Sequence, residues 1–473
     1  MTSQQHRTRD TRSTSEALES LRARVRGNVL TPDSSEFDEA RSVWNAMIDR
    51  RPAVIVQPRE TNDVIAAVNV AREYALPLSI KGGGHNIAGM AVCDSGVMID
   101  CSLMRSVNVD TATKRVRVGP GAVWGDVDQV TQPYGLVVPS GIISTTGVAG
   151  LTLGGGFGWT TRKWGHTADH LRKVEIVTAD GQVRRASEQE NRDLFWAIKG
   201  GGGNFGVVTQ FEFEARELGP TVTGGLILYP MEDAPEVIRF FREFTESAPE
   251  DLTSLLVLRI APPAPFLPEE VHGKPVAGIA AMYAGDPEEG ERAMAPLRAF
   301  GNPLADTITQ KEYVTHQSFL DSGQPHGRRY YWKSEYLSAV PDELGQIMIE
   351  HCSRFTSPHS SMLAMHLGGN AGKTASNDGA VSHKSAEYVV AIQGAWDDPD
   401  TDDRHIGWAR QFHAAVRPFS TGGTYVNFLT EEEGAERIQE AYEPEIYRQL
   451  ARVKAEFDPD NLFRHNKNIR PAN

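Results

Sequence analysis

The stretch Lys81-Gly-Gly-Gly-His85-Asn86-Ile-Ala-Gly89 decides the fold. It directly follows a predicted strand, Leu78-Ser79-Ile80, and it places three consecutive glycines before a histidine. Glycines in such a turn leave backbone N–H groups free to bind anionic oxygens, those of a pyrophosphate for example. His85 then lies beside whatever the loop binds. A lone histidine in a turn is more often structural, so the rest of the chain has to decide its role.

Two further glycine-rich stretches follow before residue 207, and 23 of the 44 glycines lie between Gly82 and Gly206. The first runs from Gly141-Ile-Ile-Ser-Thr-Thr-Gly147-Val-Ala-Gly150 to Gly154-Gly-Gly-Phe-Gly158, and the second is Ala197-Ile-Lys-Gly-Gly-Gly-Gly-Asn-Phe-Gly206. Each is also compatible with plain tight turns. Together they predict backbone surfaces and hydroxyl groups that pack against a flat ligand.

Two phosphate-loop motifs do not fit their usual context. Gly201–Gly206 satisfies GxGxxG, but a predicted helix precedes it and a predicted strand follows it. A dinucleotide fingerprint needs the opposite order. The segment Ala371-Gly-Lys-Thr374 lacks the first glycine of a Walker loop, because Leu367 stands there. Neither motif therefore predicts a nucleotide-binding loop of these kinds.

Composition narrows the function classes. The chain has 473 residues, which predicts more than one domain, and its acidic residues exceed its basic ones by 62 − 48 = 14, which disfavours binding to nucleic acid. Three cysteines form neither a disulfide framework nor a metal-binding pattern. The N-terminus lacks an apolar signal core, and the uncharged stretch 129–161 contains prolines and eight glycines. We therefore expect a cytoplasmic protein with no metal site, no membrane span and an oligomeric state that the sequence leaves open.

Hydrophobic periodicity predicts an α+β protein. A polar arm and short helix over residues 1–45 precede a mixed unit over 46–217, a second α+β domain with a helix-covered antiparallel sheet over 218–424, and a C-terminal segment over 425–473. The expected strands lie at 54–56, 78–80, 97–100, 106–110, 115–118, 174–178, 182–186, 207–214, 226–229, 255–259, 277–283, 329–336, 362–367 and 387–396. The expected helices lie at 16–26, 62–74 (with Thr61 as its N-cap), 122–134, 193–197, 236–245, 288–299, 433–441 and 444–456.

In this order and spacing, the three glycine loops resemble the flavin-binding half of the vanillyl-alcohol-oxidase/PCMH superfamily. The similarity is greatest to the berberine-bridge-enzyme-like FAD-linked oxidases of the bacterial 6-hydroxy-nicotine-oxidase type. It covers residues 45–215 and returns at Phe457-Asp-Pro-Asp-Asn-Leu-Phe-Arg-His-Asn466-Lys-Asn468-Ile469. The resemblance implies a two-domain PCMH-type fold that binds FAD. It also implies oxidation of an alcohol, a cyclic amine or a natural-product intermediate by hydride transfer, with oxygen reduced to hydrogen peroxide.

The resemblance also assigns cofactor residues. His85 stands where the family bonds a histidine to the 8α-methyl carbon of FAD, Ile143 stands where many relatives carry a second linking cysteine, and Thr146 stands at the oxygen gate. We therefore expect a single covalent link. Lys81 and Gly82 replace the Arg and Ser of many relatives. The implied FAD contacts are Lys81, Gly82, Gly83, Gly84, His85, Asn86, Gly141, Ser144, Thr145, Thr146, Gly147, Gly150, Gly156, Val208, Asn466 and Asn468.

The catalytic candidates come from the second domain and the chain that follows it. Tyr425 and Asn427 are two residues apart on a predicted strand, so both should face the substrate. Tyr388 and His366 lie on other predicted strands, and a core role is as compatible as a catalytic one for all four. The glutamate-type base of the family has no counterpart, since residues 376–383 offer only Asp378.

Two other activities remain open at this point. A flavin dehydrogenase would pass its electrons to an acceptor other than oxygen, and a flavoprotein could bind or sequester a small molecule without oxidising it. The aromatic stretch 328–336 is compatible with a cavity wall and equally with an amphipathic strand.

Overall fold

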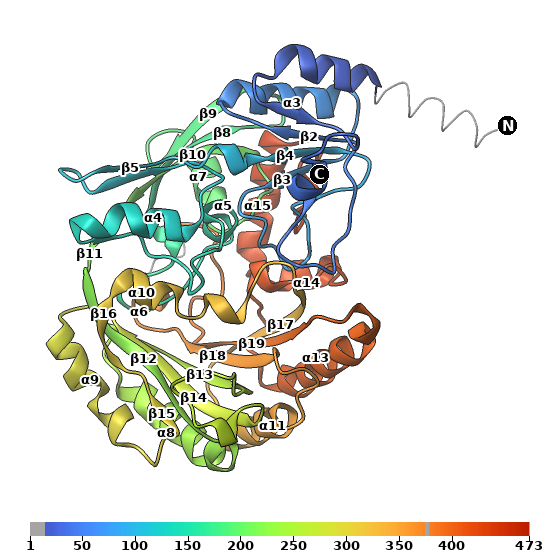
Figure 1. The fold of residues 1–473 in the computed structure, drawn as a ribbon. Coiled ribbons are helices and arrows are strands. Elements are labelled where there is room, and N and C mark those ends of the chain that lie inside the picture. Colours follow the sequence, from blue (N-terminus) through green and yellow to red (C-terminus); the bar gives the residue numbers. More distant parts are fainter. Residues whose placement is uncertain (1–14, 374–377, 473) are drawn as a thin grey trace.

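The chain folds into two layered units, and its C-terminal segment returns to the first of them, in a computed structural model that describes residues 15–373 and 378–472. The first unit begins with a sheet in the order β1-β2-β4-β3, in which β2 and β3 run parallel to β4. Its elements are β1 (Asn28–Leu30), β2 (Val54–Gln57), α3 (Thr61–Glu73), β3 (Leu78–Lys81) and β4 (Val97–Asp100). A helix over residues 15–24 packs beside α3 at the top of Figure 1.

The start of α3 differs from the expectation. Glu60, not Thr61, occupies the N-cap position, and the Thr61 hydroxyl donates instead to Glu175 at 2.8 Å. The buried carboxylate of Asp63 accepts backbone N–H groups from Arg26, Gly27 and Arg59 at 2.7, 3.1 and 2.9 Å. Through the bonds from Arg26 and Gly27, Asp63 in the first turn of α3 holds this helix against the chain that precedes β1.

A five-stranded antiparallel sheet completes the first unit in the order β5-β6-β10-β8-β9. Its strands are β5 (Val107–Asp110), β6 (Arg115–Val118), β8 (Leu171–Val177), β9 (Val183–Ser187) and β10 (Val207–Glu214), beside α4 (Trp124–Thr131) and α7 (Arg192–Ile198). The single helix expected over 122–134 is divided, because residues 132–134 form a 3-10 turn around Pro133 and Gly135 is left-handed.

The second unit is built on one large antiparallel sheet in the order β15-β12-β14-β13-β18-β19-β17, with β16 also paired to β12. Its strands are β12 (Thr221–Pro230), β13 (Leu252–Ile260), β14 (Pro275–Tyr283), β15 (Ala305–Asp306), β16 (Thr309–Glu312), β17 (Arg329–Leu337), β18 (Ser361–His366) and β19 (Tyr388–Trp396). Four helices cover the face turned away from the first unit: α8 (Ala234–Ser247), α9 (Pro287–Ala299), α11 (Asp342–Cys352) and α13 (Asp402–Val416) (Figure 1). The α+β fold expected from the sequence is confirmed.

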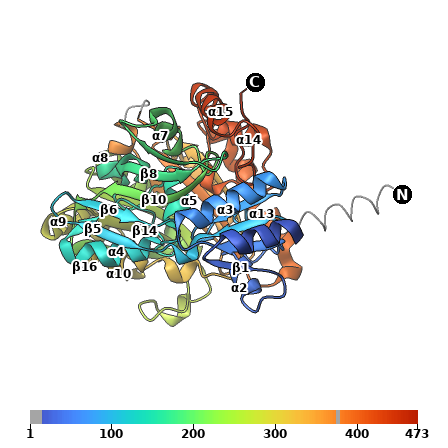
Figure 2. The ribbon, with the colours of Figure 1, turned by 90° about the horizontal axis from the view of Figure 1, so that it is seen from above.

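The C-terminal segment crosses back to the first unit. The prediction of a strand around Tyr425 is wrong, because residues Val426–Phe428 form a 3-10 turn. In this turn the side chains of Tyr425 and Asn427 hydrogen-bond to the second glycine loop, at Gly156 and Gly150. The helices α14 (Ala435–Glu440) and α15 (Pro444–Phe457) follow, and α15 packs against α7. Viewed from above, both lie at one edge of the molecule (Figure 2).

Several short elements escaped sequence prediction because they are brief or rich in glycine. The most important is α5 (Val148–Leu153), which starts directly after Gly147 inside the second glycine loop. The other short ones are α2 (Phe37–Arg41), β7 (Leu136–Val137), α6 (Thr161–Trp164), β11 (Arg216–Glu217), α10 (Tyr313–Ser318) and α12 (Asn370–Lys373), with β1, β15 and β16. The two longer helices α11 and α13 were also not expected from the sequence.

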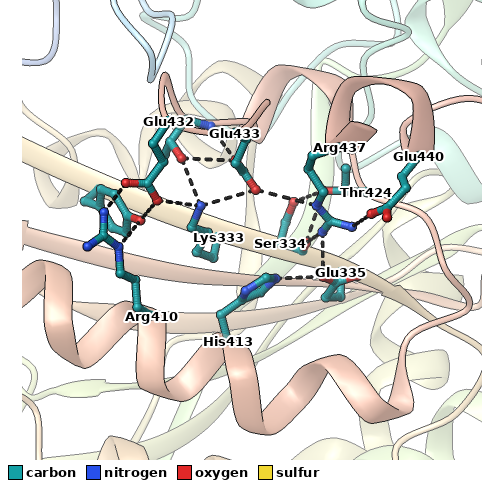
Figure 3. A network of polar contacts seen from close by, with 12 residues as sticks. Lys333, Ser334, Glu335, Arg410, His413, Thr424, Glu432, Glu433, Arg437 and Glu440 are labelled. Carbon is teal, nitrogen blue, oxygen red and sulfur yellow. Dashed lines mark hydrogen bonds and ion pairs between the residues drawn. The ribbon is translucent and has the colours of Figure 1, made fainter. Parts of the chain in front are cut away.

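A polar network fastens the C-terminal segment to β17 and α13 (Figure 3). Lys333 on β17 donates to the Thr430 hydroxyl at 3.0 Å and pairs with Glu432 and Glu433 at 3.0 and 3.2 Å. Next to it, the buried Glu335 accepts from Arg437 at 2.5 Å.

The Glu335 carboxylate also accepts hydrogen bonds from His413 at 2.7 Å and from Ser420 at 2.6 Å. Burial opposes ionisation of this carboxyl, but the hydrogen bond from His413 and the charge of Arg437 hold its pKa below the ordinary value. A buried carboxylate with this many donors stabilises the fold only while it is ionised and fully paired.

We expect Glu335→Gln to lower the free energy of unfolding by about 2–3 kcal/mol, because a charged acceptor of three hydrogen bonds is lost. Thermal unfolding of the purified protein measures this. Glu440→Gln is the matched control, since Glu440 is a more exposed partner of the same Arg437 at 2.7 Å. Glu440→Gln should lower the free energy of unfolding by less than about 1 kcal/mol.

The sign of the pH dependence follows from the lowered pKa of Glu335. The stabilisation is present above the pKa of an unfolded glutamate, about 4.3, and is lost as the pH falls through the lower folded pKa, so the stability difference between wild type and Glu335→Gln should shrink progressively below about pH 4.3. Equal losses in Glu335→Gln and Glu440→Gln at neutral pH would contradict the role given to Glu335.

Candidate functional site

A cavity of about 280 Å³ lies between the glycine loops of the first unit and the helix-free face of the large sheet. The C-terminal segment forms a third side. Of the residues singled out from the sequence, those that line it are Gly82, Gly83, Gly84, His85, Asn86, Gly141, Thr146, Gly147, Gly150, Val208, Tyr425, Asn427 and Asn466. Residues from three distant parts of the chain are thus brought to one place.

The first glycine loop presents unpaired backbone donors to the cavity. Within the described residues, the backbone N–H groups of Gly83, Gly84, His85 and Asn86 have no hydrogen-bond acceptor. Gly84 adopts a left-handed conformation with φ of +69°, and all four residues line the cavity. Such a concave set of donors is suited to the oxygens of a pyrophosphate.

The first and second glycine loops touch through their backbones. A Cβ added to Gly83 would lie 2.5 Å from Cα of Gly147, and one added to Gly147 would lie 2.4 Å from the nitrogen of Gly83. No side chain larger than hydrogen fits between them. The contact therefore sets the distance between the two loops that form this wall of the cavity.

His85 is held by an aromatic stack. Its ring lies 4.2 Å from the Trp44 ring at an interplanar angle of 18°, and Trp44 in turn stacks on Tyr330 at 3.7 Å. The buried Nε2 of His85 has no hydrogen-bond partner among the described residues, and burial lowers the pKa of the imidazole to about 4. At neutral pH the ring is therefore uncharged and keeps a lone pair available for bonding.

The tail supplies a half-buried asparagine and a buried lysine. Asn466 donates to the carbonyls of Gly203 and Phe463 at 3.0 and 2.9 Å, which leaves its buried Oδ1 without a partner in the described chain. Lys467 also lines the cavity and donates to the carbonyl of Thr430 at 3.2 Å. Burial lowers the pKa of Lys467 to about 7, against the opposing pull of Glu433.

Tyr425 and Asn427 form a coupled pair at the cavity. The Asn427 amide donates to the Tyr425 phenol oxygen at 2.8 Å, and the backbone N–H of Gly156 donates to the same oxygen at 3.2 Å. Burial raises the pKa of Tyr425 to about 12, so the phenol stays neutral. Because both acceptor positions of this oxygen are in use, its own hydrogen is left to donate to another group.

Tyr388 and His366 do not reach the cavity. The Tyr388 hydroxyl pairs with Thr245 at 2.6 Å, and the His366 Nε2 accepts from Arg162 at 2.8 Å, both under the helix-covered face. The reason is the alternation of side chains along a strand, since their neighbours Val389 and Met365 are the residues that line the cavity.

Five expected cofactor residues lie beside the cavity without lining it. The Lys81 ammonium group donates to the carbonyl of Ala40 at 2.5 Å and pairs with Asp100 at 3.5 Å, so it points toward the N-terminal segment. The backbone N–H of Ser144 donates to Asp321 at 2.9 Å. Thr145 is exposed to solvent, Gly156 contacts Tyr425, and Asn468 keeps its buried Oδ1 unpaired among the described residues.

The lining contains no carboxylate among the described residues, and Asp378 does not contribute to it. Sequence reasoning missed a group of residues that do line it: Gln324 and Gln393, with Leu255, Leu363, Met365, Val389 and Ala391 on the sheet. Most of these residues lie on β13, β18 and β19, which are largely buried on both faces, so no polar alternation marked the cavity side. The aromatic run 329–332 was the one available signal, and Trp332 is its lining residue.

Comparison with known proteins agrees with this geometry. A family model described as an FAD binding domain matches residues 52–187, and one described as berberine and berberine like matches residues 424–470. (R)-6-hydroxynicotine oxidase of Paenarthrobacter nicotinovorans is 30% identical over 458 residues, covering 94% of this chain and 97% of that protein. Xylooligosaccharide oxidase of Thermothelomyces thermophilus is 27% identical over 473 residues, covering 94% and 92%.

Solved structures of similar proteins have the same fold. The crystal structure of 6-hydroxy-D-nicotine oxidase from Arthrobacter nicotinovorans has a TM-score of 0.85 and 28% identity, covering 95% of this chain and 98% of that one. Xylooligosaccharide oxidase from Myceliophthora thermophila, in complex with xylobiose, has a TM-score of 0.84 at 22% identity, covering 98% and 100%. These matches confirm the PCMH-type fold and FAD as the cofactor.

The residues present fit FAD. The unpaired N–H groups of the first loop suit its pyrophosphate, and the paired glycines form a wall that a planar ring can approach closely. The unpartnered Nε2 of His85 and Oδ1 of Asn466 are buried polar atoms that a bound ligand would satisfy.

We expect Gly83→Ala to destabilise the protein by about 1–3 kcal/mol or to prevent folding, because the new Cβ would overlap the backbone of Gly147. Thermal unfolding measures the effect. Gly407→Ala on α13 is the matched control, since no atom lies within 4 Å of its added Cβ. The free energy of unfolding of Gly407→Ala should be higher than that of wild type by up to about 1 kcal/mol. A Gly83→Ala protein as stable as wild type would show that the two loops do not touch in this way.

Proposed function

The chain belongs to the family of berberine-bridge-like FAD-linked oxidoreductases, and on that premise we propose that it is an oxidase with one covalent flavin link, through His85. Its substrate is a small organic molecule with an alcohol or amine carbon to be oxidised. FAD bound at the glycine loops and His85 would supply the hydride acceptor for that carbon and the redox group through which the electron pair, with two protons, would reach oxygen as hydrogen peroxide. The single observation that carries the proposal is the neutral, buried imidazole of His85 at the glycine-lined cavity, with an unpartnered ring nitrogen.

The protein's own groups have defined tasks in this scheme. The loop over residues 82–86 binds the cofactor phosphates through backbone N–H groups, and Trp44 holds the His85 ring in place by stacking. Tyr425 donates its phenol hydrogen to the oxygen or nitrogen of the substrate and so orients the carbon that is oxidised. Asn427 fixes the phenol oxygen of Tyr425 at 2.8 Å.

Two further expectations concern the cellular location of the enzyme and the division of its chain into domains. Among the described helices, none is both long and apolar enough to cross a bilayer. A cytoplasmic location stays a prediction, and so does the domain division at residues 45, 217 and 424.

The covalent link is tested by acid precipitation of the purified yellow protein. We expect the flavin absorbance to remain with the precipitate in wild type and to pass into the supernatant in His85→Ala. His359→Ala is the matched control, because this histidine pairs with Asp397 on the outer side of the sheet and should retain the link. Complete release of flavin from the wild-type protein would contradict the link, although not FAD binding.

Tyr425→Phe tests the catalytic assignment. We expect the anaerobic rate of flavin bleaching by a substrate to fall by about 10²-fold or more, because the orienting hydrogen bond is lost. Stopped-flow absorbance measures it. Tyr388→Phe is the control and should keep the wild-type rate, since its hydroxyl pairs with Thr245 under the other face of the sheet.

The same experiment separates an oxidase from a dehydrogenase. On mixing with air, the bleached wild-type enzyme should recover its colour and release peroxide much faster than free flavin does. Recovery no faster than free flavin would favour a different electron acceptor, and spectral perturbation without bleaching by any substrate would favour a binding protein.

A further inference from the structure

Trp44 connects the first glycine loop to the second unit of the protein. Its ring stacks on His85 at 4.2 Å and on Tyr330 at 3.7 Å, with interplanar angles of 18° and 10°. Two rings this close to one centroid fit only on opposite faces of the indole. The main chain makes the same connection, because the Trp44 N–H donates to the carbonyl of Gly84 and the Trp44 carbonyl accepts from Gly327, both at 3.1 Å.

Asn45 repeats this connection with its side chain. Its amide donates to the carbonyls of Ile87 and Tyr330, each at 2.9 Å, and its oxygen accepts from the N–H of Tyr330 at 3.0 Å. Tyr330 lies on β17, the last strand of the large sheet, and Asn45 forms a parallel bridge with Arg328 just before that strand. Trp44 and Asn45 thus hold the edge of the large sheet against the first glycine loop.

Within the ring stack, only His85 reaches the cavity. Trp44 and Tyr330 are 3% and 2% exposed and do not line it. The indole N–H of Trp44 donates to the carbonyl of Gln324 at 3.0 Å, which fixes how the indole is turned. Trp332 does line the cavity, but it meets Trp44 edge-on, at 5.3 Å and 72°. Trp44 and Tyr330 therefore act on a ligand by fixing the orientation of His85 and not by direct contact.

We propose that Trp44 and Tyr330 are positioning residues for the covalent attachment of FAD to His85, so that attachment depends on docking of the large sheet against the first glycine loop. Tyr330 supports the indole from behind, and the indole holds the imidazole in one orientation. A nitrogen held in one orientation reacts faster than one on a freely turning ring, because less rotational freedom is lost in the transition state. The inference rests on the proposed function and deepens it, since it concerns how the link through His85 is formed.

The bond in question joins Nε2 of His85 to the 8α-methyl carbon of FAD. The lone pair of Nε2 forms the N–C bond, while one proton leaves the methyl carbon and one leaves the imidazole. The electron pair of the broken C–H bond would pass through the flavin ring to oxygen, which with the two protons becomes hydrogen peroxide. Oxygen is thus the oxidant here, as it is in the proposed reaction on substrate. The neutral, unpartnered Nε2 has the lone pair that this step requires.

Addition of FAD to the full-length protein tests the proposal, with protein that is produced in riboflavin-starved cells and is therefore free of flavin. The rate of attachment in air-saturated buffer is the rate at which flavin absorbance comes to stay with the acid precipitate. We expect Trp44→Leu and Tyr330→Leu each to slow attachment about tenfold or more, because each removes a ring from the stack. Tyr330→Leu leaves the indole in place, so it keeps the proposal testable where Trp44→Leu does not fold.

The affinity for FAD separates positioning from damage to the cavity. It is measured by equilibrium dialysis in a His85→Ala background, in which no link forms. We expect the dissociation constant to change less than about threefold on adding Trp44→Leu or Tyr330→Leu, since neither side chain lines the cavity. An affinity loss as large as the loss of attachment rate would show a merely structural role and overturn the proposal.

Three variants serve as controls. Trp44→Phe and Tyr330→Phe each keep an aromatic ring and lose one hydrogen bond, to the carbonyls of Gln324 and Pro325 at 3.0 and 2.6 Å, so both should restore most of the attachment rate. Phe240→Leu removes a comparably close stack, at 4.1 Å and 10°, on the helix-covered side of the large sheet. Phe240→Leu should lower the melting temperature without slowing attachment.

A double variant tests whether Tyr330 acts through Trp44. Trp44→Leu with Tyr330→Leu should attach FAD no more slowly than Trp44→Leu alone, whereas two independent effects would multiply and contradict the coupling. Wild-type speed in both single Leu variants overturns this inference alone and leaves the link through His85 in place. A wild-type protein that binds FAD and never retains it on acid precipitation overturns the proposed link as well.

Discussion

The backbone contact between Gly83 and Gly147 is the constraint on which the cofactor side of the cavity depends. A Cβ added to Gly83 would lie only 2.5 Å from the Gly147 Cα, so the two loops approach too closely for any side chain between them. Beside this contact, the N–H groups of residues 83–86 have no acceptor within the described chain and their residues line the cavity, and α5 starts directly after Gly147. A substitution at either glycine would therefore disturb cofactor binding and the fold at the same time.

The C-terminal segment connects the two units and completes the site. The network around Lys333 and Glu335 holds residues 424–440 on the large sheet, and α15 packs into the first unit. Between these two attachments the chain places Tyr425 and Asn427 against the glycine loop, and the tail adds Asn466 and Lys467. The catalytic candidates thus belong to neither sheet, and their position is set by charged contacts on one side and apolar packing on the other.

Sequence patterns singled out the glycine loops and His85, which the structure brings to one cavity, because glycine at close contacts and left-handed positions is required locally. They predicted most strands and helices, with errors where tertiary contacts decide the backbone. Tyr425 and Asn427 were expected on a strand and lie at a 3-10 turn, but the hydrogen bond between them still brings both to the cavity. Tyr388 and His366 could not be separated from Val389 and Met365, because β18 and β19 bury both faces and show no polar alternation.

The sequence by itself determined the class of cofactor, the candidate linking histidine and the absence of a cysteine at Ile143, since these depend on residue types at fixed spacing within single loops. Only the tertiary structure decided which face of the large sheet meets the cofactor and which polar atoms there stay unpaired. Trp332, Gln324 and Gln393 come from separate segments, and their relation exists only once β17 and β19 pair. The arrangement of these side chains at the cavity therefore depends on strand register and tertiary contacts, which no local pattern in this chain encodes.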